Sequence, residues 1–104
     1  MLTLQGIRTG LAPVGKEEAI RAAGVLLAAC GYVDGEYAEA MVARERVATT
    51  YLGMGIAIPH GTAEAKPRIR RSGIVVMQYP EGVDFGEERA QLVIGIAGAG
   101  DEHI

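Results

Sequence analysis

The chain has 104 residues, which is enough for one hydrophobic core and too few for two. Hydrophobic residues make up 49% of it and aromatic residues only 5%, so small aliphatic side chains must build that core. The formal net charge of -3 argues against a nucleic-acid-binding protein, because such a protein needs a basic surface.

The N-terminal half of the chain predicts one strand followed by two helices. Alternating apolar residues over 2–7 indicate the strand. Apolar residues spaced three and four apart predict a helix over 16–29, and Gly31 is a plausible stop for it. Asp34 is a plausible cap for a second helix over 35–46.

The C-terminal half predicts three strands, over 56–58, 72–79 and 91–97, with a turn at 81–82 between the last two. The element order is therefore strand, helix, helix, strand, strand, strand. This order indicates one α/β domain (α+β-like), with a mixed β-sheet of about four to five strands flanked by helices.

Two further features bound the class of protein. No apolar run approaches the about 20 residues of a membrane span, and no secretory signal opens the chain. The single cysteine, Cys30, excludes an internal disulfide and a multi-cysteine zinc site, and we expect it to pack in the core. We therefore expect a cytoplasmic protein without direct membrane insertion, a bound metal or a cofactor.

The candidate reactive group is His60, one of only two histidines. The short apolar strand before it is ended by Pro59, and Gly61 lets the backbone turn after it. A rigid element thus aims the side chain at a place that a partner can reach. From the spacing alone, a structural histidine at a turn is the commoner explanation.

Three motifs resemble those of a known family. They are Gly-Met-Gly-Ile-Ala-Ile-Pro-His-Gly-Thr at 53–62, Gln-Tyr-Pro-Glu-Gly-Val-Asp-Phe-Gly-Glu-Glu at 78–88, and Leu-Val-Ile-Gly-Ile-Ala at 92–97 followed by Glu-His-Ile at 102–104. Over 2–104 the chain resembles the enzyme IIA domain of the mannitol type. That type belongs to the mannitol/fructose/nitrogen IIA superfamily of the bacterial phosphoenolpyruvate-dependent sugar phosphotransferase system.

The resemblance implies the same mixed sheet, with further helices after the last strand. Family members continue for several tens of residues beyond the position of Ile104. Residues 1–104 are therefore expected to be an enzyme IIA-type phosphocarrier domain, C-terminally truncated and lacking its last helices. Apolar sheet surface would then be exposed and would favour self-association.

The resemblance also implies a site made of His60, His103 and Arg44. His60 would be the phosphorylated nucleophile, because a neutral imidazole can attack phosphorus with one nitrogen while the other N–H is held by an acceptor. His103 and Arg44 would stabilise the phosphate, since a guanidinium can hold two of its oxygens. The alternatives are an exposed histidine near a chain end and an arginine on a solvated helix face beside Arg46.

Other residues near His60 are candidates for contacts with phosphate or protein partners. Gly61 would keep the approach to His60 clear, and Thr62 would donate its hydroxyl to phosphate or cap the local turn. Arg68 and Arg70 belong to the basic cluster at 66–71, which either attracts acidic partners or is a solvated surface. The carboxylates over 81–88 are too loosely spaced to predict a metal site.

The function that the resemblance implies is a phosphotransferase with a phosphohistidine intermediate. His60 would accept a phosphoryl group from the carrier protein HPr and pass it to a cysteine of a IIB domain, for uptake of mannitol or a related hexitol. One alternative is a regulatory module like the nitrogen-type relatives. The other is an inactive truncated fragment.

Overall fold

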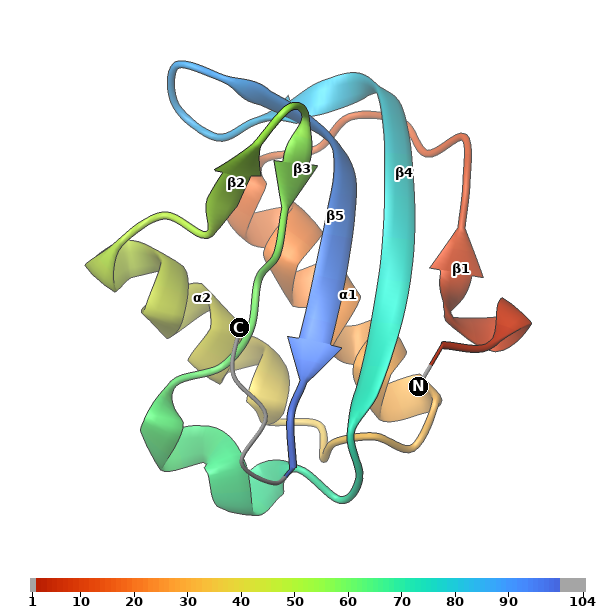
Figure 1. The fold of residues 1–104 in the computed structure, drawn as a ribbon, viewed down its shortest axis with the longest axis vertical. Coiled ribbons are helices and arrows are strands. Elements are labelled where there is room, and N and C mark those ends of the chain that lie inside the picture. Colours follow the sequence, from red (N-terminus) through yellow and green to blue (C-terminus); the bar gives the residue numbers. More distant parts are fainter. Residues whose placement is uncertain (1, 100–104) are drawn as a thin grey trace.

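The computed structural model describes residues 2–99, which form a five-stranded sheet with helices (Figure 1). Strand order across the sheet is β1-β4-β5-β3-β2. The expected α/β fold with a mixed sheet is confirmed. The strands are β1 (Ile7–Arg8), β2 (Tyr51–Gly53), β3 (Ile56–Ala57), β4 (Gly73–Asp84) and β5 (Arg89–Ala97).

The centre of the sheet is the long antiparallel pair of β4 and β5. On one side β1 runs parallel to β4, and on the other β3 runs parallel to β5. The outer strand β2 pairs antiparallel with β3 through a tight hairpin. Because β3 borders the central strand β5, the segment that follows β3 is carried along the edge of β5.

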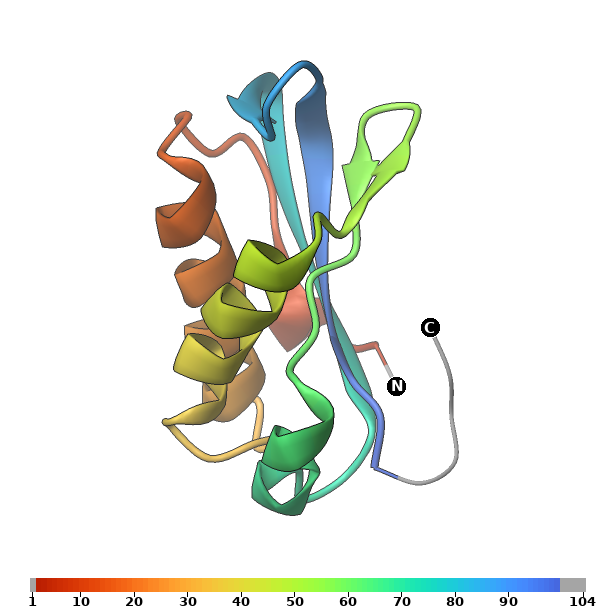
Figure 2. The ribbon, with the colours of Figure 1, turned by 90° about the vertical axis from the view of Figure 1, so that its left-hand side faces the viewer.

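Two helices, α1 (Lys16–Ala29) and α2 (Tyr37–Val47), lie side by side on one face of the sheet (Figure 2). The buried face of α1 supplies Ala23 and Leu27, which pack toward the central strands. The helices approach closely at Gly24, where an added Cβ would lie 2.5 Å from the Cα of Ala38. The two short helical turns are η1 (Leu4–Gly6) and η2 (Ala63–Arg68).

The opposite face of the central strands is not covered by α1 or α2 (Figure 2). Alternate side chains of β4 and β5 are fully buried toward the helices, whereas those between them are only half-buried. The half-buried set is mostly aliphatic and includes Ile74, Val76, Leu92, Ile94 and Ile96. Self-association through exposed apolar sheet surface stays a prediction, which analytical ultracentrifugation would check.

The predictions of two elements of the sheet are wrong. Residues 4–6 form the turn η1, and β1 begins only at Ile7, because its short parallel pairing with β4 involves Ile7 and Arg8 alone. Residues 81–82, predicted as a turn, lie inside β4. The pairing of β4 with β5 shifts register between Gln78 and Val83 at this place. The chain reverses later, where Phe85 N–H donates to the Glu88 carbonyl.

The second helix and the strand after it also differ from the prediction. Asp34 does not cap the helix; its carboxylate accepts the Glu36 N–H in a turn before α2, which begins at Tyr37. The strand β2 was not predicted, because a three-residue strand has too short a pattern and forms only by pairing with β3. In residues 2–99 no helix is both long and apolar enough to cross a membrane.

Candidate active site

His60 follows β3 and lies beside β5. Ile58 N–H donates to the Thr50 carbonyl at 3.0 Å, which ties the exit of β3 to the segment after α2. One residue later the Pro59 carbonyl accepts the Ile96 N–H at 3.0 Å, and His60 lies beside Ile96 as an isolated parallel bridge. The prediction of a histidine at a strand exit is confirmed, and its side chain is half-buried.

The orientation of the His60 ring fixes which nitrogen is available. Nδ1 lies 2.9 Å from the carbonyl oxygen of Ile58. A carbonyl can only accept a hydrogen bond, so Nδ1 must carry the proton in this contact. In the neutral ring, Nε2 then holds the free lone pair, which is the state that a nucleophile requires.

The turn after His60 packs against Tyr37, at the first turn of α2. The Tyr37 hydroxyl accepts the Gly61 N–H at 2.9 Å and donates to the Ile96 carbonyl at 3.2 Å. A Cβ on Gly61 would lie 2.7 Å from the Tyr37 ring, so this ring explains the glycine. The structure thus adds a packing requirement on the Tyr37 side, and the role of Gly61 in clearing an approach for partners stays a prediction.

Burial raises the pKa of the Tyr37 hydroxyl above its ordinary value, against the opposing effect of the hydrogen bond from Gly61. The hydroxyl therefore stays protonated at neutral pH and keeps its bond to Ile96. Tyr37 and Met41 are both buried on α2, but the contact of Tyr37 with the His60 turn was not predicted from the sequence. That contact joins residues 24 apart, and no local pattern signals it.

Thr62 directly precedes η2, and its side chain makes no capping hydrogen bond to that turn. The turn is closed instead by its backbone, since Ala65 N–H donates to the Thr62 carbonyl at 3.1 Å. Of the two predicted roles for Thr62, capping is thus wrong. A half-buried hydroxyl two residues from His60 is left for the other role, a contact with phosphate.

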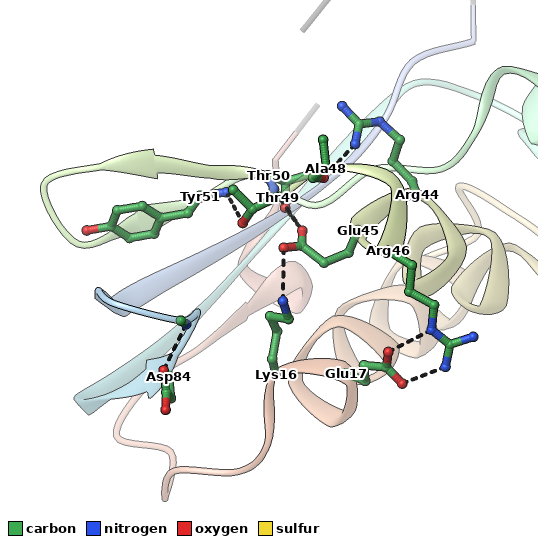
Figure 3. Close-up of polar contacts among 11 residues, drawn as sticks. Lys16, Glu17, Arg44, Glu45, Arg46, Ala48, Thr49, Thr50, Tyr51 and Asp84 are labelled. Carbon is green, nitrogen blue, oxygen red and sulfur yellow. Dashed lines mark hydrogen bonds and ion pairs between the residues drawn. The ribbon is translucent and has the colours of Figure 1, made fainter.

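Arg44 lies in the last turn of α2, and its Nη1 donates to the Ala48 carbonyl at 2.8 Å (Figure 3). Ala48 is two residues from Thr50, which pairs with Ile58 before His60. A carbonyl has no formal charge and does not neutralise the guanidinium. Among residues 2–99, no carboxylate forms an ion pair with Arg44. Arg46 differs, because its guanidinium makes two 2.8 Å bonds to Glu17.

The segment after α2 is held by the buried carboxylate of Glu45 (Figure 3). Its Oε1 accepts the N–H of Thr50 at 2.8 Å and the hydroxyl of Thr50 at 2.6 Å. Its Oε2 has no hydrogen bond and lies 3.5 Å from Nζ of Lys16, which also lies over the Phe85 ring. The cluster therefore joins α1, α2, the start of β2 and the turn between β4 and β5.

The pKa of Glu45 is lowered below its ordinary value of 4.5. Burial of the carboxyl is the largest single influence and acts to raise the pKa, but the nearby Thr49 hydroxyl, the hydrogen bonds from Thr50 and the charge of Lys16 together outweigh it. Glu45 is therefore a carboxylate at neutral pH. Its role could not be predicted from the sequence, because its burial depends on contacts with three other elements.

The basic cluster at 66–71 divides between paired and unpaired residues. Arg68 bridges the carboxylates of Asp34 and Glu36, so it secures η2 against the start of α2. Arg71 donates to the Cys30 carbonyl and stacks over the Tyr32 ring. Arg70 is exposed, and it is the predicted partner contact whose side chain enters no ion pair within residues 2–99.

The predicted second histidine, His103, lies outside the described residues. Within residues 2–99 no group of three or more histidine, cysteine, aspartate or glutamate side chains is arranged to hold a metal ion. Of the predicted site residues, the structure describes His60 with Nε2 unbonded, a half-buried Thr62 two residues along the chain, and Arg44, whose guanidinium pairs with no carboxylate within residues 2–99.

The described residues form an α/β domain that presents a histidine where a parallel strand leaves the sheet. The family model described as "Phosphoenolpyruvate-dependent sugar phosphotransferase system, EIIA 2" matches residues 1–104. The chain belongs to this EIIA 2 family of the phosphotransferase system, whose components transfer phosphoryl groups.

Individual relatives agree with this assignment. The chain is 54% identical over 106 residues to the PTS system mannitol-specific EIICBA component of Escherichia coli (strain K12), covering 99% of this chain and 17% of that protein. The crystal structure of IIA mannitol from Escherichia coli matches at 53% identity and a TM-score of 0.93, over 99% of this chain and 75% of that one.

A complex of enzyme IIA mannitol and phosphorylated enzyme IIB mannitol from Escherichia coli matches at 51% identity and a TM-score of 0.92, again over 99% of this chain and 75% of that one. The nitrogen regulatory protein IIA-Ntr from Neisseria meningitidis is more distant, with 25% identity and a TM-score of 0.71 over 91% of this chain and 66% of that one. These mannitol-specific relatives, at 51% to 54% identity, are thus more similar to the chain than this nitrogen-type protein is.

Proposed function

We propose that this chain is a phosphocarrier that accepts a phosphoryl group on Nε2 of His60 and passes it to a protein partner. The observation that carries the proposal is the 2.9 Å contact of Nδ1 with the Ile58 carbonyl, which leaves Nε2 as the nitrogen with a lone pair. Phosphohistidine is a high-energy linkage, so it suits a carrier that must give the group away. We place this reaction in the cytoplasm.

The transfer needs no separate general base. The Nε2 lone pair attacks phosphorus in line, the bond between phosphorus and the donor breaks, and its electron pair returns to the donor. In the second step a thiolate attacks the same phosphorus, and the electron pair of the phosphorus–nitrogen bond returns to Nε2. Throughout, Nδ1–H stays on the Ile58 carbonyl and prevents the ring from turning.

Charge on the phosphoryl oxygens would be offset by Arg44, whose guanidinium is bound to a carbonyl rather than to a carboxylate. We extend this role to His103, on the basis of its family resemblance, and to the Thr62 hydroxyl. Exposed Arg70 would contribute to attracting an acidic or phosphorylated protein surface. Arg68 is less suited to that role, because two carboxylates already engage it.

We further propose that the donor is phosphorylated HPr, that the acceptor is a cysteine of a IIB domain, and that the transported sugar is mannitol or a related hexitol. The support is the similarity to mannitol-specific proteins at about half of all positions and to a IIA chain in complex with phosphorylated IIB. The relative of the nitrogen branch shares only 25% identity, which makes a regulatory module the weaker alternative.

The test is phosphorylation from phosphoenolpyruvate with enzyme I and HPr, followed by intact mass of the chain. The chain has two histidines, so His60→Ala and His103→Ala form a matched pair. We expect one acid-labile phosphoryl group on the parent and on His103→Ala, and none on His60→Ala.

The transfer step is tested by adding a mannitol IIB domain to the phosphorylated parent, and loss of the group to IIB is expected. Addition that survives His60→Ala would overturn the site. No addition to a parent that circular dichroism shows to be folded would overturn the carrier function.

A further inference from the structure

Tyr37 is a buried residue with no place in the phosphocarrier chemistry, yet its hydroxyl bonds two backbone groups beside His60. Only 2% of the residue is exposed to solvent. The hydroxyl accepts the Gly61 N–H at 2.9 Å and donates to the Ile96 carbonyl at 3.2 Å. Because one oxygen uses both its proton and a lone pair, no water is needed to satisfy either backbone group.

We propose that Tyr37 is the positioning residue for His60, holding the histidine backbone so that its ring keeps the Nδ1–H form. The proposal rests on the proposed function for its consequence, the rate of phosphoryl transfer. The geometry that it describes is present in the unphosphorylated protein and can be tested there alone.

The two peptide groups that flank His60 are both anchored to β5. The carbonyl of Pro59, in the peptide before His60, accepts the Ile96 N–H at 3.0 Å. The N–H of Gly61, in the peptide after His60, reaches the Ile96 carbonyl through the Tyr37 hydroxyl. Both backbone torsions of His60 lie between these two peptides, so the two polar groups of a single β5 residue fix them.

The ring contact with the Ile58 carbonyl depends on this backbone. The Nδ1 of His60 meets the carbonyl two residues before it, and such a local contact forms only for a narrow range of the intervening torsions. The φ torsion of His60 is one of these torsions, and it is fixed only while both flanking peptides are held. If the Gly61 peptide lost its anchor, φ would be free to change, the ring would leave Ile58 and the neutral imidazole would populate both tautomers. Molecules with the proton on Nε2 would lack the lone pair on the nitrogen that we propose attacks phosphorus.

Phenylalanine at this position keeps the ring that packs on Gly61 and removes only the hydroxyl. It would leave the Gly61 N–H and the Ile96 carbonyl without their partner, and the turn would shift to find water. Errors of about 1 Å in the placement of a reacting group lower rates by about 100-fold. We therefore expect Tyr37→Phe to slow phosphoryl transfer through His60 by about 10-fold to 100-fold.

Tyr51 supplies a matched control. Its hydroxyl also accepts a glycine N–H, that of Gly55, at the same distance of 2.9 Å, but in the hairpin of β2 and β3. Tyr51→Phe therefore removes the same group and the same kind of bond at a place that does not touch the peptides around His60. A loss caused merely by a missing tyrosine hydroxyl would affect both variants alike.

The experiment compares the parent, Tyr37→Phe and Tyr51→Phe in two measurements. The first is the rate of phosphorylation by phosphorylated HPr. The second is the ¹⁵N chemical shifts of the His60 ring in the unphosphorylated chain, which report how much Nδ1–H and Nε2–H tautomer is present. We expect Tyr37→Phe alone to slow transfer and to gain Nε2–H tautomer, with circular dichroism confirming that all three are folded.

A third measurement needs no variant. In the parent chain, hydrogen exchange of the Gly61 amide should be slow, although the turn is half-exposed, because its N–H is bound to a buried hydroxyl. An unprotected Gly61 amide would overturn the proposal, as would an unchanged tautomer ratio in folded Tyr37→Phe or equal loss of rate in both variants. If the parent is not phosphorylated at all, the proposed function fails, while the tautomer and exchange data still decide the positioning.

Discussion

The two ends of α2 hold the candidate site by different kinds of interaction. At the first turn, the neutral hydroxyl of Tyr37 bonds the turn after His60 to β5. At the last turn, the charged carboxylate of Glu45 bonds Thr50, which in turn pairs with the strand exit before His60. The same helix therefore supports the segments on both sides of the histidine.

The difference lies in what each end depends on. The Tyr37 contact has no formal charge, so pH near neutrality does not alter it. The Glu45 contact requires an ionised carboxylate, which Lys16 accompanies at 3.5 Å from the other helix. A buried carboxylate that is satisfied in this way is strongly bonded, but removing one member leaves the others without partners. We therefore expect the Glu45 end to be the more costly one to disrupt.

The largest effect is expected from Glu45→Ala. The substitution removes the acceptor of two hydrogen bonds from Thr50 and the partner of Lys16, so the free energy of unfolding should fall by about 3 kcal/mol. Urea unfolding measures it. Glu45→Gln is the control, since it keeps an acceptor oxygen and should lose less. Equal loss in both would mean that the hydrogen bonds to Thr50 contribute little.

The next effect concerns the Tyr37 end. Gly61→Ala places a Cβ 2.7 Å from the Tyr37 ring, so overpacking should cost about 2 kcal/mol. The same measurement on Tyr37→Leu and on the double variant completes a double-mutant cycle. The alanine should cost much less once the ring is gone. Additive effects of the two substitutions would show that the ring and Gly61 do not constrain each other.

A smaller effect is expected on the rate of phosphorylation, and it should differ between Arg44 and Arg46, the two arginines beside Glu45. Arg44→Ala should slow phosphorylation of His60 by about tenfold, equivalent to about 1.4 kcal/mol of barrier, because the unpaired guanidinium is lost. Arg46→Ala should leave the rate unchanged, since that guanidinium is engaged with Glu17 on the surface. The assay is the rate of acid-labile phosphate incorporation from phosphorylated HPr. Reversed behaviour of the two variants would exclude Arg44 from the site.

The smallest expected effect is the change with pH in the free energy of unfolding that ionisation of Glu45 causes. Its pKa in the folded chain is below the ordinary 4.5, so its contribution is complete above that value and is lost as pH falls through the lower, folded value. The stability difference between the parent and Glu45→Gln should therefore shrink on acidification below pH 4.5. The surface carboxylates Glu17, Glu39 and Asp34, whose pKa values are also lowered, remain in both proteins and cancel.

The sequence predicted the helix over 16–29 with the bounds that the structure has, because a long amphipathic helix repeats its signal over four turns. It also predicted the central strands and the place of His60 at a strand exit. It was wrong about Asp34 and about the turn at 81–82, and it missed β2. Each of these depends on a short segment whose state is decided by pairing with distant residues.

The sequence by itself determined the family, the candidate nucleophile and the mixed sheet, because local periodicity and the motif around His60 are contiguous along the chain. Only the tertiary structure decided that Tyr37 and Glu45 hold the segments on the two sides of that histidine. It also decided that Arg44, unlike Arg46, pairs with no carboxylate within residues 2–99. These facts depend on hydrogen bonds and ion pairs between residues that are adjacent only after folding. Burial, which gives those contacts their strength, does not exist until the helices pack on the sheet.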